Sequence, residues 1–262
     1  MSEPGLGVVF LPQSPPERLR EVALAAEATG AVELWLFEDC FSAGGLTAAA
    51  AALAWTENLQ VAIGLLPVPL RNPALAAMEI ATVARLFPGR LLPGVGHGVP
   101  DWMGQVGARA PSPMTLLAEH TTALRELLHG RTVDVDGDYV RLRDVTLDWP
   151  PAEVPPILVG ARGPKTIRLA AELGDGVILD TGTPADAVRA SCADIAGARA
   201  AAGRTEPFRV VVYVQLEEPT PQRVTASAEE LGAAGADTVV FLAGAADPDP
   251  MPLIKACAAA RT

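Results

Sequence analysis

Short apolar runs alternate along the whole chain with longer stretches of helical periodicity. The short runs are rich in Val, Ile and Leu and lack clean in-and-out alternation, which is typical of parallel strands covered on both faces. The longer stretches are rich in Ala and Leu at helical spacing. The predicted strands are residues 6–11, 33–37, 60–66, 91–95, 156–159, 176–179, 208–215 and 237–242. The predicted helices lie near residues 15–29, 46–56, 73–86, 113–129, 164–173, 184–202, 220–233 and 250–260.

This order of elements predicts an α/β fold, a (β/α)8 TIM barrel that forms a single domain over residues 1–262. A doubly wound sheet is the competing fold. A glycine-rich fingerprint after the first strand would favour that fold, but this chain has LPQSPPERL there. Residues 132–149 interrupt the alternation, because they alternate apolar and polar positions around Asp136-Gly137. They predict a β-hairpin insertion before the fifth strand.

Composition excludes several classes of function. A net charge of −11, with only two lysines, argues against binding to nucleic acid or to anionic membranes. No apolar run approaches the ~18 residues of a membrane span, and no basic-then-apolar leader opens the sequence. Cys40, Cys192 and Cys257 suit a reducing compartment and lack metal-ligand spacing. We therefore expect a cytoplasmic protein that acts on a small molecule and holds no metal.

In a barrel, chemistry is placed where strands end. The second predicted strand ends in Glu38-Asp39-Cys40. We expect Asp39 and Cys40 to reach the rim of a site, and Glu38 to face away or to cap the turn. No Gly-x-Ser-x-Gly motif is present and no basic partner for Cys40 is evident, so a bystander thiol is the simpler interpretation.

Residues 156–166, PILVGARGPKT, predict an anion site. A strand leads into the Gly160–Gly163 turn and then into a helix opened by Pro164, where free amides and the helix dipole favour negative charge. Arg162 and Lys165 add positive charge, and Thr166 adds a hydroxyl. The alternative is a glycine-rich turn with solvated cations.

Residues 93–102, PGVGHGVPDW, form a second candidate segment. Their glycines lack a Cβ, so a flat or bulky group can approach the backbone closely. His97 is either a functional group or a hydrogen-bonded loop histidine. The other two histidines belong to a predicted helix, and His129 before Gly130 fits a helix C-terminus.

Three ordered segments together resemble the bacterial luciferase-like superfamily, most strongly its branch that uses the deazaflavin coenzyme F420. They are LWLFEDCF, VAIGLLPVPLRNPALAAMEIATVARLFPGRLLPGVGHG and PPILVGARGPKTIRLAAELGDGVIL. Within them, Arg71-Asn72-Pro73 resembles the family's Arg-His-Pro after the third strand. Phe87-Pro88-Gly89-Arg90 resembles its glycine-arginine motif before the fourth.

The resemblance implies a deazaflavin or flavin ring lying across the strand ends. It implies a non-prolyl cis peptide between Gly64 and Leu65 behind the ring, and an acid near the ring at Asp39. It further implies that the edge of the ring is lined by Gly94, Val95, Gly96 and His97. The cofactor phosphate would be held by Gly160, Ala161, Arg162, Gly163, Lys165 and Thr166.

The chain departs from the family pattern at two positions. Many relatives have histidine where this chain has Cys40, and sugar-phosphate dehydrogenases of the family have an acid where this chain has Val99. The mechanism of that subfamily is therefore not transferred. The chain is also short for the family, so we expect some of the family's substrate-covering insertions to be absent.

The main hypothesis is an F420-dependent oxidoreductase that transfers hydride to or from a small organic substrate. His97 is the first candidate for handling the proton, because its reference pKa lies near neutrality, followed by Asp39 and Cys40. The alternatives are an FMN-dependent monooxygenase, a non-catalytic flavin- or deazaflavin-binding protein, and a cofactor-free lyase or isomerase. We expect a homodimer through the Ala-rich helices 46–56 and 73–86, although tight packing of these helices on the barrel explains the same pattern.

Overall fold

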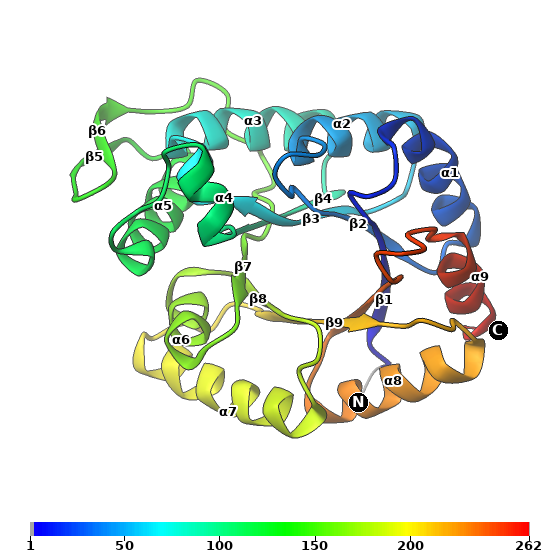
Figure 1. Cartoon of the computed structure of the whole chain (residues 1–262). Helices are drawn as coiled ribbons and strands as arrows, with labels where there is room; N and C mark the ends of the chain where they lie inside the picture. Colours follow the sequence, from blue (N-terminus) through cyan, green and yellow to red (C-terminus); the bar gives the residue numbers. More distant parts are fainter. Residues whose placement is uncertain (1–2, 262) are drawn as a thin grey trace.

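Eight parallel strands form a closed barrel at the centre of the molecule (Figure 1). The computed structural model describes residues 3–261. Around the barrel the strands follow the order β1-β10-β9-β8-β7-β4-β3-β2, so the first and last strands are neighbours. The predicted (β/α)8 barrel is confirmed. Its strands are β1 (Gly5–Phe10), β2 (Glu33–Leu36), β3 (Val61–Pro67), β4 (Leu91–Gly96), β7 (Leu158–Ala161), β8 (Gly176–Leu179), β9 (Arg209–Gln215) and β10 (Thr238–Leu242).

The strands are covered on both faces, which explains why they read as continuous apolar runs. Every residue of β8 and of β10 is buried. The barrel closes where Gly5 of β1 lies opposite Thr238 of β10. The pairing of β3 with β4 shifts its register between Ile63 and Leu66, so the one irregular stretch of that pair falls at the segment proposed above to face a ring.

Helices surround the barrel (Figure 1). Several begin with proline, whose missing N–H has no intrahelical partner at that position anyway. Asn72 caps α3 by accepting a hydrogen bond from the Ala74 amide at 2.9 Å. The helices are α1 (Leu19–Thr29), α2 (Gly45–Trp55), α3 (Pro73–Leu86), α5 (Pro113–Leu128), α6 (Pro164–Leu173), α7 (Ala185–Ala201), α8 (Pro221–Ala234) and α9 (Met251–Ala259), with short 3-10 turns η1 (Pro16–Arg18) and η2 (Val68–Leu70).

The predicted hairpin is confirmed and lies outside the barrel, next to α5 (Figure 1). Its antiparallel strands are β5 (Val133–Asp136) and β6 (Arg141–Val145). Glu119 of α5 holds the turn between them by accepting hydrogen bonds from three successive backbone amides, those of residues 138–140, each at 2.9 Å. Burial alone would raise the pKa of Glu119, but these bonds and Arg141 hold it below the ordinary value.

Two local predictions need correction. The segment after β4 was predicted as a loop but contains the helix α4 (Pro100–Gln105), which is too short to produce a periodic signal. The strand predicted from residue 156 begins at Leu158. Pro156 has no N–H for a ladder, and the Ile157 amide instead donates to the Asp175 carboxylate at 2.9 Å.

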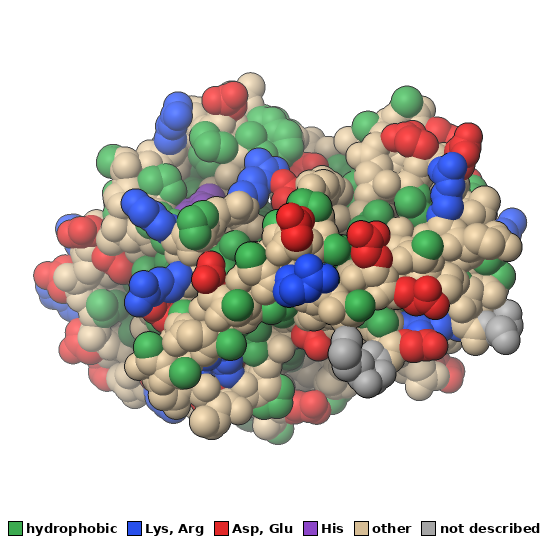
Figure 2. Space-filling model, turned by 90° about the horizontal axis from the view of Figure 1, so that it is seen from below, with side chains coloured by type: hydrophobic (Ala, Val, Ile, Leu, Met, Phe, Trp, Pro, Cys, Tyr) green, Lys and Arg blue, Asp and Glu red, His purple; other side chains and the backbone are tan. Residues whose placement is uncertain are grey.

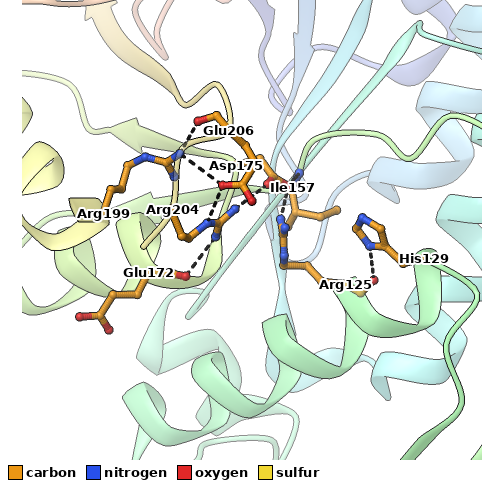
Figure 3. A network of polar contacts seen from close by, with 8 residues as sticks. All are labelled: Arg125, His129, Ile157, Glu172, Asp175, Arg199, Arg204 and Glu206. Atoms are coloured by element: carbon orange, nitrogen blue, oxygen red, sulfur yellow. Dashed lines mark hydrogen bonds and ion pairs between the residues drawn. The ribbon is translucent and has the colours of Figure 1, made fainter. Parts of the chain in front are cut away.

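A network of ion pairs joins the amino ends of the strands (Figure 3). Asp175, directly before β8, is paired with Arg125 of α5 and with Arg204, whose Nη2 lies 3.1 Å from the carboxylate. Burial alone would raise the pKa of Asp175, but the hydrogen bonds from Arg125 and Ile157 and the charges of both arginines hold it below its ordinary value. Asp175 is therefore a buried acid with several donors, whereas Nη1 of Arg199 in the same network is buried without a partner among the described residues.

The outer surface is mixed in charge over the side that carries α7 and α8. Acidic and basic side chains are interspersed there, without a single large patch of either sign (Figure 2). Within residues 3–261, no helix combines the length and the apolar character needed to cross a membrane.

Candidate active site

A cavity of about 450 Å³ opens at the carboxyl ends of the barrel strands. Its lining comes from residues in or directly after β2, β3, β4, β7, β8, β9 and β10, together with parts of α4 and α6. This is the end of a (β/α)8 barrel at which active sites lie.

Glycines form one side of this cavity. Gly64 and Leu65 line it, and the peptide bond between them is cis, as the resemblance implies. A Cβ at Gly64 would collide with the Tyr213 hydroxyl, and a Cβ at Gly96 or Gly160 would collide with the Leu65 side chain. The close packing of Leu65 and Tyr213 therefore requires glycine at these positions. The cavity surface here is thus formed by the Leu65 side chain together with Gly64 and Gly160.

An aromatic cluster supports that surface from beneath. The Tyr213 ring packs edge-on against Trp35, with centroids 5.6 Å apart, and lies 5.4 Å from the ring of Phe37. Its hydroxyl donates a hydrogen bond to the Gly64 carbonyl at 3.3 Å. Burial, followed by the charges of Asp180 and Asp39, raises the pKa of Tyr213 well above its ordinary value, so the phenol stays protonated. Tyr213 is thus a fixed donor that orients the Gly64 peptide.

Asp39 is the acid without a cationic partner. It lines the cavity directly after β2, is half-buried, and makes no ion pair among the described residues. Burial raises its pKa. Cys40 is next to it but does not line the cavity. Burial, then the charges of Glu38 and Asp39, raises the pKa of the Cys40 thiol, so the thiol is not activated as a nucleophile.

Glu38 behaves differently from its neighbour. It is buried, accepts a hydrogen bond from the Gly45 amide at 2.7 Å, and pairs with Arg71. Arg71 Nη2 donates to the same carboxylate at 2.9 Å and its Nε donates to Glu79 at 3.1 Å. Glu38 accepts from the first residue of α2, as expected of a capping group, but it also lines the cavity and so does not face away from it.

His97 follows β4 and lines the cavity. Burial lowers its pKa, and a contact with the Pro113 carbonyl only partly opposes that effect. The ring is therefore neutral near pH 7. Its Nδ1 is buried without a hydrogen-bond partner among the described residues. A neutral imidazole with an unpartnered nitrogen can accept or supply a proton at this point.

Positive charge enters the cavity from the turn before α6. Arg162 and Thr166 line it, and Arg162 Nε lies 2.5 Å from the Asp180 carboxylate. The Arg162 side chain is 84% exposed, so this pair is weakly held and its guanidinium can exchange partners. Lys165 is exposed on α6 and does not line the cavity.

The cavity brings together many, but not all, of the residues proposed from the sequence. Those lining it are Asp39, Gly64, Leu65, His97, Gly160, Ala161, Arg162 and Thr166. Those outside its lining are Cys40, Gly94, Val95, Gly96, Gly163 and Lys165. Gly94 and Gly96 are instead covered by neighbouring strands: a Cβ at Gly94 would meet the Ile63 carbonyl at 2.6 Å, and one at Gly96 would meet Leu65. Val95 is 1% exposed and belongs to the core.

Several lining residues were not proposed from the sequence, among them Trp102, Asp180 and Tyr213. Asp180 had a signal, because it is an acid directly after a predicted strand. Tyr213, one of only two tyrosines, interrupts an apolar strand with a polar tip. Trp102 ends the candidate segment 93–102, but it was not singled out because the helix that carries it was not predicted.

Comparisons with known proteins agree with the fold. The profile of the family described as luciferase-like monooxygenase matches residues 5–217. A 5,10-methylenetetrahydromethanopterin reductase from Methanolobus tindarius is 28% identical over 208 residues, which cover 79% of this chain and 63% of that protein. An F420-dependent glucose-6-phosphate dehydrogenase from Mycobacterium avium is 33% identical over 186 residues, which cover 65% of this chain and 55% of that protein. The aligned region thus spans less than two thirds of each relative.

Solved structures share the fold along almost the entire chain. An F420-dependent secondary alcohol dehydrogenase, in complex with an F420–acetone adduct, superposes with a TM-score of 0.88 at 18% identity, covering 97% of this chain and 98% of that one. The coenzyme F420-dependent tetrahydromethanopterin reductase from Methanopyrus kandleri gives a TM-score of 0.84 at 17% identity and covers 98% of both chains.

Proposed function

Because the chain belongs to the luciferase-like monooxygenase family, we propose that it is an oxidoreductase that binds coenzyme F420 in the cavity at the strand ends and transfers hydride to or from a small organic substrate. The observation that carries the proposal is the glycine-bounded surface at Gly64 and Leu65, with a neutral His97 and an unpaired Asp39 on the same cavity. The sequence relatives at 28–33% identity are F420-dependent by name or are methylenetetrahydromethanopterin reductases.

The residues present fit a deazaflavin. Gly64, Leu65 and Gly160 offer backbone to a flat ring, and Tyr213 holds the Gly64 peptide in place. Arg162, Thr166 and the amino end of α6 suit a phosphate, because the helix dipole and a guanidinium both favour an anion. When bound, a deazaflavin supplies hydride chemistry in two-electron steps.

The protein's own side chains would manage protons and water around that chemistry. His97, held neutral, lines the cavity and would accept or donate a proton there through its ring. Asp39 places negative charge beside the ring position without a compensating cation. Phe37, Trp102 and Leu242 line the cavity with apolar surface and exclude water from the reacting atoms.

A binding experiment tests the proposal. Purified protein is titrated with F420 and with FMN, and followed by cofactor fluorescence and by protection against heat. We expect saturable F420 binding, and about tenfold weaker binding for Arg162→Glu, because a charge-assisted contact to phosphate is replaced by repulsion. The matched control is Arg168→Glu, an exposed arginine of the following helix α6 that lies outside the cavity.

The outcomes separate the alternatives. Binding of FMN without binding of F420 would overturn the cofactor proposal and favour a flavin-dependent monooxygenase. Unchanged F420 affinity in Arg162→Glu would refute the phosphate position. F420 binding without hydride exchange to any of a panel of alcohols, aldehydes and pterins would favour a non-catalytic cofactor-binding protein.

We also propose that the protein is a homodimer through the outer faces of α2 and α3, which lie side by side in Figure 1. The sequence of α2 contains no charged residue, and α3 exposes Leu75, Met78 and Leu86 by 47%, 57% and 65%. An apolar face can meet a second copy of itself about a two-fold axis without like-charge repulsion. Light scattering should show that Met78→Asp is a monomer. The control Leu24→Asp, on α1, should remain a dimer. A monomeric wild-type protein would exclude the proposal.

A further inference from the structure

A second cavity, of about 420 Å³, is formed where η2 and the start of α3 meet the loop after α4, α5 and the β-hairpin. Its lining includes Arg71, Arg109 and His120 and contains neither Asp nor Glu. This is unusual in a chain whose net charge is −11. The cavity is separate from the candidate active site, and no lining residue is shared between the two.

His120 is the deepest polar group of this cavity. It lies on α5 and is only 2% exposed, yet neither ring nitrogen makes a hydrogen bond of ordinary geometry among the described residues. A buried polar group without a partner costs free energy, so such a group calls for an occupant of the cavity that completes it. Burial lowers the pKa of His120 to about 4, with the Arg71 charge adding to this effect and a contact with the Arg71 backbone opposing it.

Arg109 supplies the free charge. It is exposed and makes no ion pair or hydrogen bond within residues 3–261. Arg71 is different, because Glu38 and Glu79 already neutralise it from outside the cavity. The net positive potential of the cavity therefore comes from Arg109, reinforced by the amino end of α3 at Asn72 and Pro73.

A further donor is available from the hairpin. The Tyr139 hydroxyl accepts a hydrogen bond from the Ser112 amide at 2.7 Å, which fixes the oxygen at the cavity and leaves its own proton free to donate. Glu119, the acid next to His120 in sequence, is committed to the hairpin amides. The uncommitted groups around the cavity are thus mainly donors and a cation.

We propose that this second cavity binds a small oxyanion, a carboxylate or phosphate group, between Arg109, His120 and Tyr139. Such a group accepts several hydrogen bonds at once and brings the negative charge that Arg109 lacks. It gives the buried His120 ring an acceptor for its N–H. The site is independent of the cofactor proposal, because none of its residues lines the first cavity.

The three histidines allow a direct test. His97 lines the first cavity, His120 lines the second, and His129 lies at the exposed end of α5, so imidazole NMR signals report on the two cavities and on bulk solvent separately. Protein with ¹⁵N-labelled histidine, both free and saturated with F420, is titrated at pH 7 with inorganic phosphate or with acetate. Chloride at equal ionic strength is the reference. Each histidine signal is assigned by its His→Gln variant.

We expect a saturable shift of the His120 signals with phosphate, acetate or both, in the presence and absence of F420, and none with chloride. Arg109→Glu should weaken that binding by about tenfold or more, because a charge-assisted contact becomes repulsive. Arg189→Glu, the same change at an exposed and unpaired arginine on α7, should change it by less than about twofold.

Other outcomes overturn the proposal. A His120 shift that follows ionic strength equally for chloride shows screening rather than a site. Oxyanion binding that moves only His97 places the anion in the first cavity. Unchanged affinity in Arg109→Glu, in a variant whose unfolding transition matches the wild type, removes Arg109 from the site. A His120 shift with phosphate but not acetate, or the reverse, supports the proposal and shows whether the cavity prefers a phosphate or a carboxylate group.

Discussion

At the amino end of the barrel, Asp175 is shared by Arg125, Arg204 and the Ile157 amide (Figure 3), whereas at the carboxyl end Asp39 is half-buried and makes no ion pair within residues 3–261. The two acids respond in opposite directions. The partners of Asp175 hold its pKa below the ordinary value, and burial without a partner raises that of Asp39. Asp175 thus has its buried charge satisfied, whereas Asp39 does not.

The difference is informative because both ends belong to the same strands. A buried acid with a full set of donors stabilises the fold, whereas a desolvated acid without partners costs stability and persists where function requires it. Glu38 shows that the carboxyl end is able to satisfy an acid, since Arg71 and the Gly45 amide complete it. Asp39, the next residue in the chain, is therefore a local exception rather than a property of the whole rim.

The largest expected effect is on stability at the amino end. Asp175→Asn removes the charge that two partly buried arginines share, and we expect the free energy of unfolding to fall by about 3 kcal/mol. Asp180→Asn is the matched control at the other end, where the partner Arg162 is 84% exposed. Its cost should stay below about 1 kcal/mol. Urea denaturation of the two variants and the wild type measures both.

Equal costs for the two variants would contradict the comparison, because the two acids would then be equivalent structural groups. F420 affinity supplies a second measurement on the same proteins. It should remain unchanged in folded Asp175→Asn, since that residue lies at the opposite end of the strands from the cavity.

The fold could be predicted from the sequence to a much greater extent than the contacts at the amino end of the barrel. The strand and helix order was predicted because long periodic segments carry a strong local signal, and α3 and α6 lie within the predicted bounds. The ion-pair network could not be predicted, because Arg125 and Asp175 are 50 residues apart and only the barrel closure brings them together. Long-range pairing of this kind has no periodic signature.

The sequence identified cavity-lining residues where the functional side chain closely follows a predicted strand. Asp39, His97 and Arg162 each follow a predicted strand, and each lines the cavity. Lys165 was placed with Arg162 by sequence proximity, but Lys165 is exposed on α6 and does not line the cavity. His120 was treated only as part of a helix, since no pattern shows that its ring is left without partners.

The second prediction removes the unsatisfied acid itself. Asp39→Asn keeps the shape and deletes a desolvated charge, so the free energy of unfolding should stay the same or rise by about 1 kcal/mol. Hydride transfer with bound F420 should fall, because the charge beside the ring position is lost. Urea denaturation and stopped-flow F420 absorbance give the two values. A loss of stability as large as that of Asp175→Asn would show that Asp39 is structural.

A smaller effect is the dependence of stability on pH. The wild type should have a larger free energy of unfolding than Asp175→Asn. This difference should be complete above the ordinary aspartate pKa of about 3.9 and should be lost as pH falls through the lower folded pKa of Asp175. Relative to Asp39→Asn, the wild type should lose stability as pH rises from about 3.9 through the raised folded pKa. Denaturation series between about pH 3 and 7 test whether the two slopes have opposite signs.

The smallest effect concerns the thiol beside the unsatisfied acid. Burial raises the pKa of Cys40 more than the charges of Glu38 and Asp39 do, and the thiolate is the form that reacts. Iodoacetamide at neutral pH should therefore modify Cys40 more slowly in the folded protein than in the unfolded protein. Asp39→Asn should accelerate modification only about twofold to threefold, because one nearby charge is the minor cause. Peptide mass spectrometry gives the rates, with Cys257, whose pKa is raised to about 12, as the unreactive reference. Rapid modification of wild-type Cys40 would instead identify an activated thiol at this rim.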